Sequence, residues 1–267
     1  YPLRLFLCLK FGFLAFFLFP IAFLLATSFK TPDQVLAGGF FPVRAVLDNW
    51  STAFETVPLA LFLRNSVVAA MLAGLLTLII TVPAVYAVEK LRIAHNWLPN
   101  FVLGVYLAPP VVALLPLFFM LRFTGLLDSV AGLVLVFGLM NIPVAFWLLR
   151  PFVVGIPREI DEASWVDGAG FWRTLIFINL PLLSPALVAT GLICMILSYN
   201  EFLFASTFTF ADEARTLTVG VSLFQGDRLV NFGQMAVASL TAIIPVYFVA
   251  LIFQRWLIGG LTAGGVK

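Results

Sequence analysis

Long uncharged stretches of hydrophobic residues recur along the chain, separated by short polar segments. Stretches of about 18 residues or more are typical of transmembrane helices. None of them alternates apolar with polar positions, as the strands of a membrane barrel do. The pattern predicts an all-α, polytopic membrane protein with six transmembrane helices. The predicted spans, of which the fifth is interrupted only by Glu201, are Phe11–Phe29, Ser66–Val88, Trp97–Leu121, Ser129–Leu149, Leu182–Phe210 and Phe232–Gln254.

The spans leave little of the chain for a separate soluble domain. We expect a single transmembrane domain over residues 1–267, with core spans at about residues 60–258. Lys and Arg are enriched on the cytoplasmic side of membrane proteins. Nine of the 15 lie on the side of the two termini and six on the other side, so we place both termini in the cytoplasm. The chain begins with Tyr1 rather than Met, as expected if N-terminal residues are missing.

The composition agrees with a membrane protein and gives no sign of nucleic-acid binding, disulfides or a metal site. Hydrophobic residues make up 62% of the chain and charged residues 10%. The net charge of +2 is too small to indicate binding to nucleic acid. Two cysteines and a single histidine, His95, predict neither a disulfide framework nor a metal site.

The segment Arg158–Arg173 differs from its surroundings because it is densely charged and contains two glycines. Acidic residues follow Pro157, where they favour the positive end of a helix. Ile160, Ala163 and Val166 form a narrow apolar stripe at three-residue spacing, and Gly168 suits a left-handed helix end. The pattern predicts a short amphipathic helix, a glycine turn and a second helix leading into the fifth span. Such a helix either docks on a partner or packs on its own membrane domain.

The same segment resembles a known family motif. Glu162-Ala163-Ser164, Asp167-Gly168-Ala169 and the later Ile178, Leu180 and Pro181 resemble the EAA loop of ATP-binding-cassette (ABC) importer permeases, with Ser164 in place of the usual alanine. The resemblance covers most of the chain. It implies the type I ABC importer permease fold and is strongest to the smaller permease of maltose/trehalose-type sugar importers. The other segments that carry it are Pro109, Pro110 and Pro116, then 121–127, 142–150, 199–203 and 261–267.

This resemblance implies a coupling role for residues 156–181, in which the loop helix sits in a cleft of a cytoplasmic ATPase. It also implies that the C-terminal tail approaches that ATPase through Gly264, Gly265 and Lys267. The implied partners are a second permease, an ABC ATPase dimer, an external substrate-binding protein and the lipid of a bacterial or archaeal plasma membrane. The implied coupling residues are Glu159, Glu162, Ala163, Ser164, Asp167, Gly168 and Ala169.

Several chemistries lack their sequence signals. No phosphate-binding loop of the form G-x-x-x-x-G-K-[ST] occurs, and no nucleophile, base and orienting residue cluster together. We therefore expect a transport subunit rather than an enzyme, with no cofactor of its own. ATP and Mg²⁺ are expected on the partner ATPase.

Glu201 is a carboxylate within an otherwise apolar stretch. At about 1.5 Å per residue from Leu182, it lies roughly 28 Å along a helix, near the outer membrane face. An outer gate, a cavity mouth or a docking point for the binding protein fits this depth. So does pairing at the interface between permeases, or contact with lipid headgroups. We group Asn200 with Glu201, and Pro109 with Pro110, as candidate gate or pathway residues, because prolines bend helices either for packing or along a pathway.

The sequence thus predicts the permease of an ATP-driven importer for di- or oligosaccharides such as maltose or trehalose. Import of polyols or glycerophosphodiesters by the same fold is an alternative. A self-sufficient secondary transporter or channel is an alternative from another class, although such folds place charges near the membrane midplane.

Overall fold

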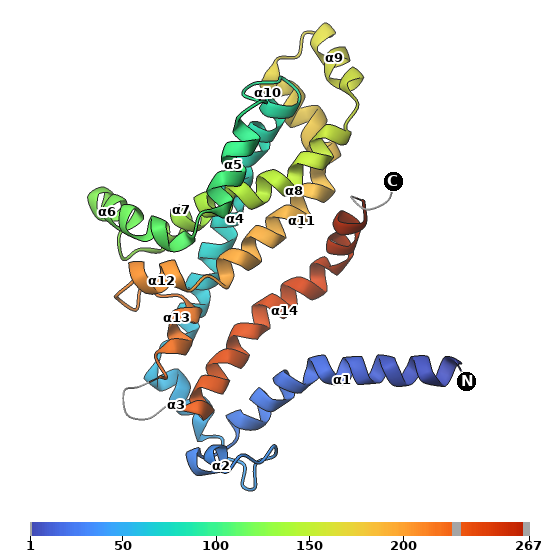
Figure 1. Ribbon diagram of the computed structural model, residues 1–267. Coiled ribbons are helices and arrows are strands. Elements are labelled where there is room, and N and C mark those ends of the chain that lie inside the picture. Colours follow the sequence, from blue (N-terminus) through green and yellow to red (C-terminus); the bar gives the residue numbers. More distant parts are fainter. Residues whose placement is uncertain (1, 226–230, 264–267) are drawn as a thin grey trace.

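Every regular element in the described part of the chain, residues 2–225 and 231–263, is helical in this computed structural model (Figure 1). The longest helices are α1 (Pro2–Ser28), α4 (Leu59–Glu89), α11 (Leu180–Tyr199) and α14 (Phe232–Ala263). The shorter ones are α2 (Pro32–Leu36), α3 (Asp48–Thr56), α5 (Leu98–Leu107), the 3₁₀ helix η1 (Pro110–Ala113), α6 (Leu114–Thr124), α7 (Val130–Met140), α8 (Ile142–Gly155), α9 (Arg158–Val166), α10 (Phe171–Thr174), the π-helix η2 (Leu175–Asn179), α12 (Leu203–Phe208) and α13 (Leu217–Ser222).

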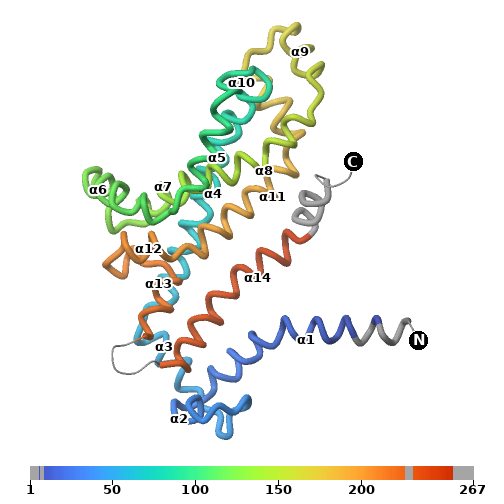
Figure 2. Tube along the Cα trace, in the orientation of Figure 1, coloured from blue at the N-terminus to red at the C-terminus, as the bar shows by residue number. Residues whose placement is uncertain are grey.

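Four helices in the described residues are long and apolar enough to cross a membrane, and the number is six if each of two bent helix pairs is one span. Four are continuous: Leu9–Ser28, Leu59–Glu89, Phe171–Tyr199 and Phe232–Gln254. The other two are bent pairs, in which α5 meets η1 and α6 at 96° and α7 meets α8 at 46°. This agrees with the six spans predicted from the sequence, and Figure 2 traces their order along the chain.

Two predicted spans have a different shape from that expected. The third is not one helix, because Pro109 and Pro110 supply no backbone N–H and hold Ala108 in an extended conformation with ψ 135°. The fifth ends at Tyr199 rather than at Phe210. The residues after Tyr199 turn and form the separate helix α12.

Helix α4 lies at the centre of the bundle and packs against α7, α8 and α11. Small side chains on its buried face allow this close packing, as is usual between membrane helices. Thr77 Oγ1 donates a hydrogen bond to the carbonyl of Gly138 on α7 at 2.9 Å. The bend between α7 and α8 lies at Asn141. A hydrogen bond joins this bend to α11, because Asn141 Nδ2 donates to Ser198 Oγ at 2.8 Å.

Helix α1 stands apart from this bundle. Figure 1 shows it leaving the ends of α2 and α3 and pointing away from the other spans. Its main contact is α14, and only 6% of the apolar stretch within Leu9–Ser28 is buried by the rest of the chain. The figure also places α9 at one end of the bundle and α2 and α3 at the opposite end.

Gly132 offers a test of the packing at the start of α7. A Cβ atom there would lie 2.2 Å from the backbone oxygen of Leu126. We expect Gly132→Ala to lower the stability of the purified protein by about 1–3 kcal/mol, since a backbone atom cannot yield to the added methyl group. Gly104→Ala is the control, because nothing lies within 4 Å of its Cβ position. Thermal unfolding in detergent measures both, and equal melting temperatures would contradict the packing described here.

Candidate functional site

The charged segment forms the short helix and glycine turn that its pattern predicts. Helix α9 covers Arg158–Val166, with Glu159 and Asp161 in its first turn. Gly168 has φ +81°, a left-handed conformation that favours glycine. The turn is closed by the N–H of Ala169, which donates to the carbonyl of Ser164 at 2.9 Å. The chain then continues through α10 and η2 directly into α11.

Helix α9 buries two polar residues and leaves its apolar stripe outside. In the stripe, Val166 is 87% exposed and Ile160 is 36% exposed. Asp161 is 1% exposed and Ser164 is 5% exposed, whereas Glu159 and Glu162 are exposed like the stripe. The helix is therefore attached to its own membrane domain by polar contacts, and its apolar side is left for another molecule.

Asp161 is the main attachment point. Its Oδ1 accepts hydrogen bonds from the Tyr86 hydroxyl on α4 at 3.0 Å and from Asn179 Nδ2 on η2 at 2.8 Å. Its Oδ2 lies 3.5 Å from the ammonium of Lys90, which follows α4 directly. Asp161 is not among the site residues predicted from the sequence. The available signal was its position on the side of the helix away from the apolar stripe, but the sequence does not identify its partners.

Ser164 adds a second attachment. Its hydroxyl donates to the carbonyl of Asp161 at 2.7 Å and shares a hydrogen bond with Thr174 Oγ1 at 2.9 Å. Thr174 is the last residue of α10 and is fully buried. The serine at this position therefore joins α9 to the helix that leads into the fifth span, which an alanine could not do.

The other predicted coupling residues lie on the outside of the segment. None of the acidic side chains among them forms an ion pair with any residue that the structure describes. Ala169 is half-buried, and those that are exposed are Glu159, Glu162, Ala163, Asp167 and Gly168. The predicted tail residues Gly264, Gly265 and Lys267 lie outside the described residues.

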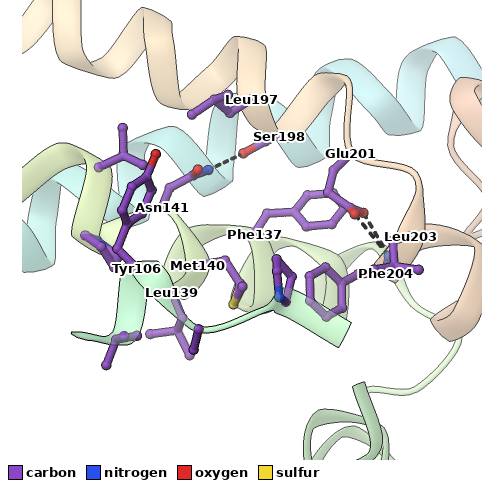
Figure 3. A pocket seen from close by; sticks show the side chains of 15 residues that line it. Tyr106, Phe137, Leu139, Met140, Asn141, Leu197, Ser198, Glu201, Leu203 and Phe204 are labelled. Atoms are coloured by element: carbon purple, nitrogen blue, oxygen red, sulfur yellow. Dashed lines mark hydrogen bonds between the residues drawn. The ribbon is translucent and has the colours of Figure 1, made fainter. Parts of the chain in front are cut away.

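A cavity of about 370 Å³ opens between the two broken spans and the end of α11 (Figure 3). Of the four predicted pathway residues, Pro110 and Glu201 line it, whereas Pro109 and Asn200 do not. Its wall is mostly apolar and aromatic, with polar atoms at a few positions. The residues that Figure 3 labels are Tyr106, Phe137, Leu139, Met140, Asn141, Leu197, Ser198, Glu201, Leu203 and Phe204.

Glu201 also has a structural role at the cavity wall. Its carboxylate accepts hydrogen bonds at 3.1 Å from the backbone N–H groups of Phe204 and Ala205, in the first turn of α12. The N-cap residue Phe202 offers no side-chain acceptor, so Glu201 caps this helix in its place. Burial raises the pKa of the Glu201 carboxyl, and these hydrogen bonds oppose that rise. Within the described residues of this chain, Glu201 forms no ion pair.

Four continuous apolar helices and two bent apolar pairs in the described residues indicate a multi-pass membrane protein. No family model matches the chain. The trehalose/maltose transport system permease protein MalG of Thermococcus litoralis is 34% identical to it over 94% of this chain and 91% of that protein. The sulfoquinovosyl glycerol transport system permease protein SmoH of Agrobacterium fabrum is also 34% identical, over 94% and 89%.

A solved structure of an ABC transporter has a similar fold. The crystal structure of a bacterial ABC transporter that imports the acidic polysaccharide alginate matches with a TM-score of 0.77, covering 94% of this chain and 96% of that chain at 23% identity. The identity and coverage of the curated relatives show the family directly. The chain belongs to the sugar ABC transporter permeases.

Two substitutions distinguish the capping role of Glu201 from the effect of its charge. We expect Glu201→Ala to lower the stability of the purified permease by about 1 kcal/mol, a typical loss when a helix cap is removed. Glu201→Gln keeps an oxygen acceptor for α12 and should lose less. Thermal unfolding of the two variants in detergent measures the difference. A Gln variant as unstable as the Ala variant would show that the carboxylate does not act as a cap.

Proposed function

We propose that the chain is the transmembrane permease subunit of an ATP-driven importer for carbohydrates, forming half of the translocation path. The observation that carries this proposal is how α9 is attached. Two buried polar residues, Asp161 and Ser164, join it to the membrane domain, while Ile160 and Val166 are exposed. A helix held in this way presents an apolar surface to a second protein.

The second protein is an ABC ATPase dimer, which binds ATP and Mg²⁺ in place of this chain. We assign the contact to the exposed coupling residues, with Glu162 offering a carboxylate and Gly168 setting the turn. ATP then acts by favouring one global conformation of two permeases over the other, since a ligand shifts an equilibrium only by its preference for one state. In this arrangement α9 and both termini face the cytoplasm, and an external binding protein delivers the substrate on the opposite side.

The cavity beside Glu201 is a candidate part of the pathway. It lies where the third and fourth spans are broken, and irregular backbone inside a membrane occurs where it is buried in protein or lines a cavity. Pro110 and Glu201 belong to its wall. Aromatic side chains such as Tyr106 and Phe204 offer flat apolar faces of the kind that pack against sugar rings.

Carbohydrate is the substrate class that the relatives support. Those with the printed names trehalose/maltose, sulfoquinovosyl glycerol and diacetylchitobiose permeases span 92% or more of this chain. We propose a di- or oligosaccharide such as maltose or trehalose for this permease. Uptake of a polyol or a glycerophosphodiester in place of these sugars would support the alternative substrate class within the same mechanism.

The left-handed turn after α9 gives a test of the ATPase contact. Gly168→Pro removes a φ of +81° that proline cannot adopt. We expect this variant to reach the membrane at the normal level but to lose the co-purifying ATPase and ATP-driven uptake. Gly170→Ala is the matched control, because Gly170 has φ −82° and open space around its Cβ position. Full transport by Gly168→Pro would contradict the proposal.

Composition of the intact complex tests the function as a whole. We expect the affinity-tagged permease, purified from native membranes, to retain a second permease and an ABC ATPase. In liposomes the complex should accumulate labelled maltose or trehalose only with ATP and the binding protein. Transport by the permease alone, without ATP, would instead support a secondary transporter or channel.

A further inference from the structure

Glu89 and Lys90, where α4 ends, are buried charged residues that no motif accounts for. They are 6% and 8% exposed, although they lie just after the predicted second span, Ser66–Val88. Their side chains lead to different elements. Glu89 contacts Arg150 on α8, and Lys90 contacts Asp161 on α9 and Ile156, the residue after α8.

Lys90 connects α4 to the loop helix. Its ammonium lies 3.5 Å from Asp161 Oδ2 and donates a hydrogen bond to the carbonyl of Ile156. Both side chains of the pair are almost fully buried, with 3% and 2% of their surface exposed. Asp161 Oδ2 accepts no hydrogen bond from the described residues, so Lys90 is its main electrostatic partner.

Glu89 extends the same connection to a third element. Arg150 Nε on α8 donates to Glu89 Oε1 at 2.8 Å, and His95 Nδ1 lies 3.8 Å from Oε2. The Arg150 guanidinium also stacks near the Trp147 ring, at 5.2 Å from its centroid. Two consecutive residues therefore join the end of α4 to α8 on one side and to α9 on the other.

Burial makes these connections stiff. A buried carboxylate is stable only while its charge and hydrogen-bonding partners stay in place. If α9 moved relative to α4, Asp161 would leave Lys90 and Tyr86 together and would remain unpaired away from water. Displacement of α9 therefore carries α4 with it at much lower cost than separation of the two.

We propose that Lys90 and Asp161 are positioning residues that form a rigid joint between α9 and α4, and that the Glu89–Arg150 pair extends this joint to α8. The inference rests on the proposed function, because it takes α9 as the element on which the ATPase acts. In this proposal, buried residues transmit the movement of α9 into the spans, and the exposed coupling residues only contact the ATPase.

The test uses the intact permease–ATPase complex, with spin labels introduced at Arg158 on α9 and at Ile79, an exposed residue of α4. The distance between the labels is measured without nucleotide and after trapping with ATP, Mg²⁺ and vanadate. For a rigid joint, the distance changes between the two states by less than about 2 Å, the size of ordinary helix shifts at interfaces.

Three variants test the role of the pair. Asp161→Asn and Lys90→Met each leave one buried group without its charged partner, so the distance should broaden or change between states. The double variant removes both charges and keeps an acceptor for Tyr86 and Asn179, so it should return toward the original narrow distance. Single variants that behave like the original protein, or a double variant no better than the singles, would overturn the joint.

Two further variants keep the test decisive. If the single charge variants do not assemble, Tyr86→Phe takes their place. It removes one hydrogen bond to Asp161 but leaves the Lys90–Asp161 pair intact, so the distance distribution should broaden less. Asp212→Asn is the matched control, because its ion pair with Arg215 at 2.9 Å is exposed. Failure of the original complex to retain an ATPase would reject the proposed function, whereas normal retention with unaltered distances in all variants would reject only the joint.

Discussion

The attachment of α9 depends on one buried carboxylate outside the membrane-spanning helices. Asp161 is enclosed by the Tyr86 hydroxyl, the Asn179 amide and the Lys90 ammonium, which come from two different spans. Such a group is stable only where several donors surround it, so its position fixes α9 relative to α4 and η2. Ile160 and Val166 are exposed because they lie on the helix side that is turned away from Asp161.

Within the membrane a different constraint shapes the pathway. Backbone N–H and C=O groups must be satisfied without water, so a span breaks only where protein or a cavity compensates. Both breaks occur beside the same cavity. Asn141 bonds to Ser198 at one break, and the Pro109-Pro110 turn closes the other. Glu201 completes this region, because one carboxylate both caps the start of α12 and lines the cavity.

The sequence predicted most features that depend on local patterns. Six spans, the α9 helix and the left-handed turn at Gly168 follow from hydrophobic length, periodicity and glycine placement. Features that depend on contacts between residues far apart in the sequence could not be predicted from local patterns. Asp161 resembles its acidic neighbours in sequence, yet its partner Tyr86 lies 75 positions away. The end of the fifth span was placed too late because residues 202–210 are apolar, although they form the separate helix α12.

The substitution at Ser164 shows how the two constraints meet. An alanine there would lack the hydroxyl oxygen and would leave Thr174 without this partner in a fully buried position. With serine, α9 is joined to α10 by a side-chain hydrogen bond in addition to the contacts of Asp161. Since α10 continues through η2 into α11, the loop helix is connected at once to the end of α4 and to the start of α11. Under the proposed function, a force on the exposed face of a helix held at two such points would act on both spans together.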